Sequence, residues 1–129
     1  MERSKARSQQ RRQRTADAEQ SYRQFLDRTA TPVARQLGQA LKAEGYPFTV
    51  FTPSGGVRLA SDHGRDDYVE LSLDTTSDPP EVVGRVSRVR GSRTLTSERT
   101  LKPGVSPSEI TDEDVLAYLV ESLEPWLER

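Results

Sequence analysis

The sequence predicts an α+β domain of two layers, in which an antiparallel meander of about five strands is flanked in sequence by a kinked N-terminal helix and a C-terminal helix. Apolar residues recur every three or four positions over 15–44 and again after 110, which is typical of helices that bury one face. Between these segments, residues 46–101 alternate apolar and polar positions and are interrupted by short turns. Both helices need an apolar surface, so we expect them on one face of the sheet, with water on the other.

The composition bounds the class of protein. A chain of 129 residues has the length of one domain, and its apolar share of 33% is low mainly because of its first 21 residues. The absence of cysteine excludes disulfides and thiolate metal sites. No apolar run is long enough to span a bilayer, and none follows the basic N-terminus as a secretory signal requires. We therefore expect a cytoplasmic protein with no membrane partner.

Residue usage bears on the source of the chain. Arginine outnumbers lysine by 16 to 3, and asparagine is absent. This bias indicates a GC-rich prokaryotic genome. The scarcity of thermolabile residues also suits a thermophile, so the composition leaves both origins open.

Residues 1–14 are predicted to form a basic arm that is flexible on its own, ahead of a single domain over 15–129. The arm carries six basic side chains against one glutamate and has no apolar face. A segment of this composition is disordered, or it forms the frayed first turns of the helix that follows.

The first predicted helix covers residues 15–44 and ends at Gly45. Pro32 interrupts it and either begins a new helix after Thr31 or kinks a continuous one. The apolar stripe keeps its phase across the proline, so we expect two helical segments that meet at a kink and rest on one surface. The residues of this stripe are Tyr22, Phe25, Leu26, Thr29, Val33, Leu37, Ala40 and Leu41.

Five strands are predicted between residues 46 and 101. The last two form a hairpin over 81–89 and 93–101, closed by the residues at 90–92. Because the connections are short, neighbouring strands must be antiparallel, which makes the sheet a meander. The first three strands place alternate side chains on one face: Tyr46, Phe48 and Val50; Val57, Leu59 and Ser61; and Val69, Leu71 and Leu73.

A linker over 102–110 leads to the final helix, which has the clearest local signals. Thr111 is expected to cap it, while Ile110 and Val115 form a hydrophobic staple across the cap. The acids at 112–114 compensate the positive end of the helix dipole. The apolar stripe is predicted to consist of Leu116, Leu119, Val120, Leu123 and Leu127, with Pro125 kinking or ending the helix beside Trp126.

No residue is predicted to be catalytic, to bind a cofactor or to ligate a metal. His63 is the only histidine, and it would be a base oriented by a carboxylate, or a metal ligand together with Asp62, Asp66 or Asp67. One histidine without cysteine does not build the usual zinc site, and an exposed turn rich in Asp and Gly explains the segment better. The Ser-Gly-Gly turn at 54–56 lacks the lysine and the following helix of a phosphate loop. We therefore expect no enzymatic activity.

Formal charge is sorted along the chain. Residues 1–14 carry a net +5 and residues 106–129 a net −6, while the segment between them is neutral. The predicted hairpin and its flank, 81–105, hold six cations against two glutamates, and alternation places Arg88 and Arg90 on one side of the strand and Arg85 on the other. The residues expected to contact a partner or nucleic acid are Arg3, Lys5, Arg7, Arg11, Arg12, Arg14, Arg85, Arg88, Arg90 and Arg93.

These patterns predict a small, non-enzymatic protein-interaction module, such as an adaptor, a regulator or a chaperone-like protein. A two-layer domain leaves a free sheet face and a free edge, and charged segments favour docking. The alternative is an accessory protein that binds nucleic acid through the arm and the hairpin together. The arm would also fit an acidic protein surface, and the last helix offers one, either in the same molecule or in a second copy within a homo-oligomer.

Overall fold

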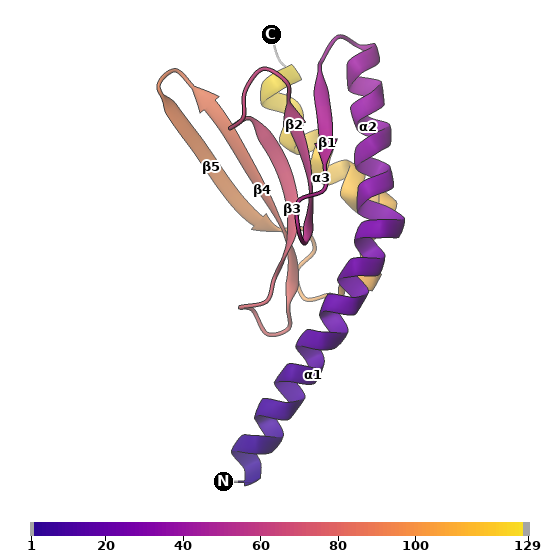
Figure 1. Ribbon diagram of the computed structural model, residues 1–129, viewed down its shortest axis with the longest axis vertical. Helices are drawn as coiled ribbons and strands as arrows, with labels where there is room; N and C mark the ends of the chain where they lie inside the picture. The colour runs from indigo at the N-terminus through magenta and orange to yellow at the C-terminus, as the bar shows by residue number, and fades with distance from the viewer. Residues whose placement is uncertain (1, 128–129) are drawn as a thin grey trace.

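The computed structural model describes residues 2–127, and their side chains from residue 4 onwards. It has the predicted α+β order, with a five-stranded antiparallel sheet between an N-terminal and a C-terminal helical element (Figure 1). The elements are α1 (Glu2–Phe25), a π-helical turn (Leu26–Ala30), α2 (Thr31–Ala43), β1 (Phe48–Phe51), β2 (Gly56–Ser61), β3 (Tyr68–Asp74), β4 (Glu81–Arg90), β5 (Arg93–Thr100), a 3-10 turn (Pro107–Glu109) and α3 (Asp112–Leu127).

The sheet is the meander that the short turns predict. Its strands follow the order β1-β2-β3-β4-β5, and each neighbouring pair is antiparallel. Arg90 pairs with Arg93 at the end of the last hairpin, so a two-residue turn joins β4 to β5. Gly91 in this turn has φ 65°, a conformation that glycine adopts without steric cost. Glycine at this position therefore fixes the register of β4 against β5.

The N-terminal helical element bends at the π-helical turn that joins α1 to α2 (Figure 1). The backbone N–H of Thr31 donates to the carbonyl of Leu26, five residues back. Pro32 follows at once, and a proline ring clashes with the carbonyl four residues before it. The wider turn relieves that clash and gives the bend that the sequence predicts. The two segments meet there, as expected, and α2 begins with the proline in its first turn.

Most of the predicted N-terminal stripe faces the core. Tyr22, Phe25, Val33 and Leu41 are buried, whereas Ala40 is exposed, so the prediction was wrong for that residue. Gly38, two positions earlier, belongs to the buried face of α2 instead. A Cβ built on Gly38 would lie 3.5 Å from side-chain atoms of Val50 and Leu59, which shows how closely α2 approaches the sheet there. The remaining members of the predicted stripe, Leu26, Thr29 and Leu37, are half-buried.

The cap of α3 is built as the sequence predicts, and the buried face of the helix overlaps the predicted stripe only in part. The hydroxyl of Thr111 accepts from the N–H of Asp114 at 3.2 Å, and Ile110 and Val115 are both buried. Val115, Tyr118, Leu119 and Leu123 face the core, whereas Leu116 and Val120 are each 44% exposed. The predicted stripe was therefore wrong for these two residues. Because α3 is apolar over a wide arc, its contact with the sheet decides which part is buried.

The end of α3 continues through its proline. Pro125 lies inside the helix, which runs on to Leu127. Trp126 packs edge-to-face on Phe48, with ring centroids 5.9 Å apart, so the expected packing of the tryptophan against the domain is found.

The core lies between the helices and one face of the sheet. The buried residues Val57, Leu59, Val69, Leu71 and Val82 form the inner face of β2, β3 and the start of β4. Residues of α2 and α3 belong to the same apolar cluster, so both helices cover this one face, and α3 passes behind the strands in Figure 1. The outer face carries polar and aromatic side chains, among them Arg58, Tyr68, Glu70 and Arg85.

Tyr22 ties the N-terminal helix to the sheet. Its side chain is 3% exposed, and its hydroxyl donates to the carbonyl of Gly55 at 2.8 Å and lies 3.4 Å from the carbonyl of Leu71. Burial, reinforced by the negative charge of Glu70, raises the pKa of Tyr22 well above its ordinary value of 10.0. The folded state therefore holds the neutral phenol, whereas the unfolded chain ionises it from about pH 10.

This difference predicts a loss of stability at high pH. The contribution of Tyr22 is complete below pH 10, and above it the free energy of unfolding should fall by about 1.4 kcal/mol per pH unit for this group. Burial also raises the pKa of Tyr118, which adds to the fall. Urea unfolding is measured at several pH values between about 9 and 11, the range in which free tyrosine titrates. The free energy of unfolding should decline less steeply with pH for Tyr22→Phe than for the unmodified protein. Equal declines would show that Tyr22 does not titrate differently on folding.

Candidate interaction surface

The predicted basic residues fall in two separate places. Lys5, Arg7, Arg11, Arg12 and Arg14 lie on the exposed first part of α1, which projects away from the rest of the molecule (Figure 1). The tip of the β4–β5 hairpin lies at the opposite end of the long axis. The two basic elements therefore do not join into one continuous surface. The side chain of Arg3 lies outside the described residues.

Within the hairpin, the register assigns each arginine to a face. Arg88 and Arg90 lie on the side of the sheet that faces α3, as alternation predicts, and Arg93 joins them because it pairs with Arg90. Arg85 lies on the outer face, where its guanidinium is 3.8 Å from a carboxylate oxygen of Glu98. Three of the four predicted hairpin residues thus share one face.

A groove opens between this face of the hairpin and α3. It has a volume of about 820 Å³ and is lined by Val86, Arg88, Arg90 and Leu95 on the strands, and by Tyr118, Glu121 and Pro125 on the helix. It begins at Gly84, where the missing side chain lets the Tyr118 ring rest directly on β4. Beyond this contact Val86 and Arg88 are half-buried, and Arg90 and Leu95 are exposed.

Arg99 crosses the groove and was not among the predicted site residues. Its guanidinium donates to Glu121 at 3.3 Å and lies 4.8 Å from the centre of the Tyr118 ring. Charge alone could not single it out, since its position depends on α3. The groove thus has a cationic wall on the strands and a partly acidic wall on the helix, with the apolar side chains of Val86 and Leu95 between the cations.

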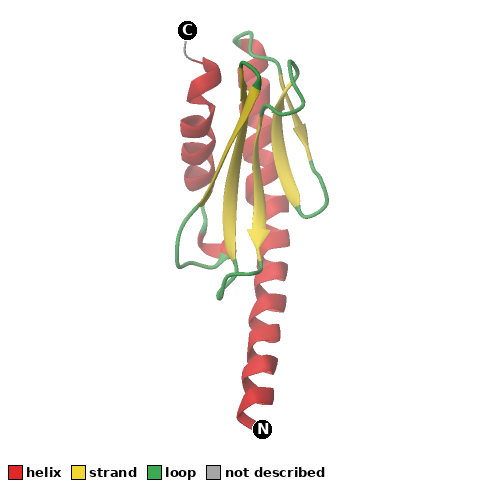
Figure 2. Ribbon diagram, turned by 90° about the vertical axis from the view of Figure 1, so that its left-hand side faces the viewer, coloured by secondary structure: helices red, strands yellow, loops and turns green. Residues whose placement is uncertain are grey.

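β5 is the uncovered edge of the sheet. Its residues from Arg93 to Arg99 are exposed, and β4 is its only neighbour among the described strands (Figure 2). After a two-residue turn, alternate residues of the second strand point their backbone groups away from the first. In β5 these residues are Thr94, Thr96 and Glu98, and their backbone N–H and C=O groups make no further hydrogen bond in the described chain. The edge is therefore ready to pair with another strand.

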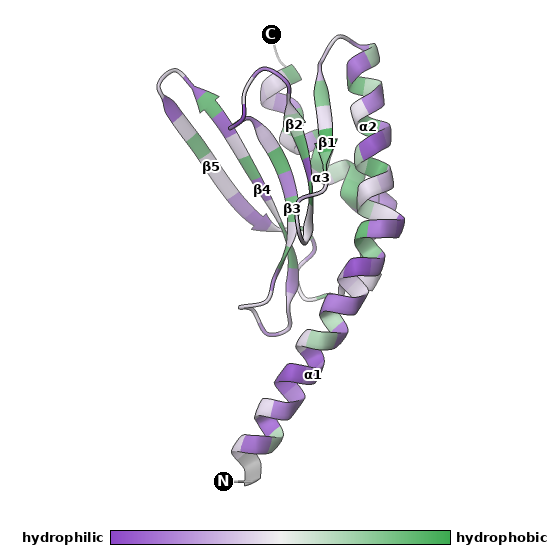
Figure 3. Ribbon diagram, viewed as in Figure 1, coloured by the Kyte–Doolittle hydropathy of each residue, from purple (hydrophilic) through white to green (hydrophobic). Residues whose placement is uncertain are grey.

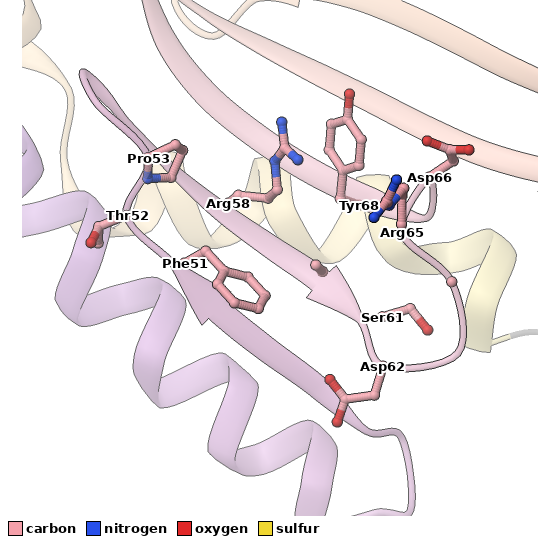
Figure 4. Close-up of a pocket in the computed structure, with 11 residues that line it drawn as sticks. Phe51, Thr52, Pro53, Arg58, Ser61, Asp62, Arg65, Asp66 and Tyr68 are labelled. Carbon is pink, nitrogen blue, oxygen red and sulfur yellow. The ribbon is translucent and has the colours of Figure 1, made fainter.

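The outer face of the sheet carries a second hollow, of about 1000 Å³, below the loop between β2 and β3 (Figure 4). Arg58 stacks on Tyr68 at 3.9 Å from the ring centre and donates to Glu70 at 3.1 Å. Asp62 and Asp66 lie apart on the loop in Figure 4. His63 is exposed in the same loop. Asp62, which lines this hollow, accepts a hydrogen bond from the hydroxyl of Thr49 at 2.6 Å, and the described residues form no cluster of three metal-binding side chains.

The comparisons with known proteins add no relative. No family model, no curated protein and no solved structure matches the chain. None of the helices within residues 2–127 is both long and apolar enough to cross a membrane. The groove and the free edge of β5 lie side by side and together form the candidate interaction surface.

Proposed function

We propose that the protein is a protein-binding module that takes an extended segment of its partner as a sixth strand on β5. The observation that carries this proposal is the exposure of β5 on both faces and along one edge. Strand addition supplies affinity through backbone hydrogen bonds and specificity through alternate side chains. The outward groups of Thr94, Thr96 and Glu98 would supply the hydrogen bonds.

The groove sets the chemistry of the partner segment. Alternate side chains of an added strand would lie beside Arg93, Leu95 and Arg99, which all face α3. Opposite charges on neighbouring strands attract, and apolar side chains gain by covering Leu95, which is 41% exposed. The preferred segment therefore places acidic and apolar side chains on the side that faces α3. On the opposite side any polar side chain is suitable. An adaptor, a regulator and a chaperone-like protein would all use such a surface.

The position of the hairpin argues against the alternative in which arm and hairpin bind one nucleic acid together. The two basic elements lie at opposite ends of the molecule, and Arg99 already pairs with an acid of α3. The hairpin cations are better placed to receive a carboxylate within the groove than to follow a phosphate backbone that also reaches α1.

The substitution Thr96→Pro tests the proposed strand addition. Proline removes the outward N–H of Thr96, which is not used in pairing with β4, so the sheet should remain folded. A synthetic peptide of repeated Glu-Ser-Val-Ser places Glu and Val on one side of an added strand and Ser on the other. It should bind the unmodified protein, and Thr96→Pro should weaken binding about tenfold or more, since at least one backbone hydrogen bond is lost and the ring crowds the added strand. Fluorescence anisotropy of the labelled peptide measures both affinities.

Two controls accompany this measurement. Thr96→Ala keeps the backbone N–H and should bind the peptide as the unmodified protein does. A peptide of repeated Lys-Ser-Val-Ser should bind more weakly, because its Lys side chains lie beside the arginines of the groove. Equal affinity of Thr96→Pro and Thr96→Ala would contradict strand addition at β5.

A further inference from the structure

The exposed part of α1 is a helix that the rest of the molecule does not cover. All side chains from residue 4 to residue 14 are exposed, and Figures 1 and 2 both show this part of α1 projecting beyond the sheet. The same helix continues into the body, where Tyr22 and Phe25 are buried. The projecting segment is therefore held out from the domain by a fixed anchor.

This segment lacks the features with which a helix binds another protein. A helix that docks in a protein groove uses apolar side chains three or four positions apart. Between residues 4 and 14 the only apolar side chain is Ala6, and this part of α1 is mostly purple, that is hydrophilic, in Figure 3. Five of its eleven residues are Lys or Arg, and none is acidic. Charge is thus its only strong source of affinity, which indicates a polyanion.

The cations lie on two sides of the helix. With about 100° of rotation per residue, Arg7, Arg11 and Arg14 fall within about 60° of one another, while Lys5 and Arg12 lie on roughly the opposite side. Gln9 and Gln13 fall between the two cationic rows. Their uncharged amide groups both donate and accept hydrogen bonds.

We propose that this segment, residues 4–14 of α1, binds double-stranded DNA by lying in the major groove. The major groove admits an α-helix, and the two rows of cations then face the phosphates on its two walls. Gln9 and Gln13 face the base edges, where glutamine pairs with adenine. The major groove of duplex RNA is deep and narrow, so duplex DNA is the preferred ligand. This activity is separate from peptide binding at β5.

Two features of the chain are compatible with this binding. The one ion pair of the segment joins Arg14 to Asp78 at 3.0 Å, and both side chains are about half exposed. Exposed pairs of this kind are weak, so Arg14 can exchange the carboxylate for a phosphate. Two acids of α3 are already paired, Asp114 with Lys102 at 3.2 Å and Glu121 with Arg99 at 3.3 Å, which lessens the repulsion that this helix exerts on a DNA duplex bound to the arm.

The test measures the binding of a labelled, mixed-sequence DNA duplex to the full chain over a range of salt concentrations. Binding should weaken with salt, with a slope of log K against log salt of about −3 to −5 for the contacts of up to five cations. The double variant Arg7→Gln/Arg11→Gln should reduce the magnitude of this slope by about 1.8. Circular dichroism of the domain and its melting temperature should stay unchanged, because neither residue touches the core.

The matched control makes the same charge change on the hairpin. Arg88→Gln/Arg90→Gln removes two cations at the other end of the molecule, so the slope for DNA should equal that of the unmodified protein. An equal reduction in both double variants would overturn the proposal, because the attraction would then be a property of net charge. Peptide binding at β5 is measured separately, so failure of one activity leaves the other standing.

Three further outcomes would overturn the proposal. The first is the absence of DNA binding at low salt. The second is equal affinity for duplex RNA, which excludes reading of the major groove. The third is a mass above 14.5 kDa by light scattering without DNA, lost in Arg7→Gln/Arg11→Gln, which would assign the arm to the acidic α3 of a second copy.

Discussion

Gly84→Ala is expected to destabilise the protein by about 3 kcal/mol, the range in which overpacking of a core lies. A Cβ on Gly84 would lie 2.0 Å from both the Cζ and the hydroxyl oxygen of Tyr118, far inside any permitted contact. Tyr118 is 3% exposed and cannot swing away without exposing its ring or opening the core beneath α3. The midpoint of urea unfolding should therefore fall markedly.

A second glycine supplies the control for this measurement. Gly38 lies inside α2, and a Cβ there would meet Val50 and Leu59 at an ordinary distance of 3.5 Å. Alanine is favoured over glycine in a helix by up to about 1 kcal/mol, so Gly38→Ala should be neutral or stabilising. Similar losses in both variants would show that Tyr118 does not rest on Gly84. Tyr118→Leu should restore part of the stability of Gly84→Ala, since it shortens the side chain that clashes.

Leu123→Ala is expected to destabilise the protein by about 3 kcal/mol, within the 2–5 kcal/mol observed when a buried leucine is truncated. Leu123 is 0% exposed and lies in the centre of the core that α3 shares with the sheet. The loss combines the apolar surface no longer buried with the cavity left behind. Leu116→Ala on the same helix should cost well under about 1 kcal/mol, because Leu116 is 44% exposed.

This pair of variants distinguishes the observed orientation of α3 from the one that the sequence predicts. The predicted stripe contains both leucines, and equal losses would therefore support it. Chemical unfolding of the two variants under the same conditions is sufficient to distinguish the two orientations. Both variants replace a leucine of α3 by alanine, so any difference between their losses of stability comes from the position of the residue.

The elements of the fold could be predicted from the sequence because each has a local signal. The strands alternate with a period of two, so Leu59 and Leu71 can only share the buried face. The cap of α3 depends on residues within four positions of one another, and it is found as predicted. The orientation of α3 depends instead on Gly84, which is distant in the sequence.

The candidate surface could be predicted only in part, because some of it depends on contacts between segments that are distant in the sequence. Alternation separated Arg85 from Arg88 and Arg90, and the register confirms that separation. The groove requires α3 to rest on β4 at one glycine and to leave the rest of the hairpin uncovered, a relation between distant segments. Arg99 belongs to the site only through Glu121 and Tyr118. Nor does the sequence reveal that arm and hairpin point to opposite ends of the molecule.

The π-helical turn makes the N-terminal helical element tolerant of a change in length. Phe25 and Ala30, at its two ends, are both buried although they are five positions apart, one more than a regular helix allows on a single face. Removal of the exposed Asp27 would leave them four apart, on the same face of an ordinary turn. The chain can therefore lose a residue inside a helix at the expense of crowding around Pro32, with every core side chain still in its place.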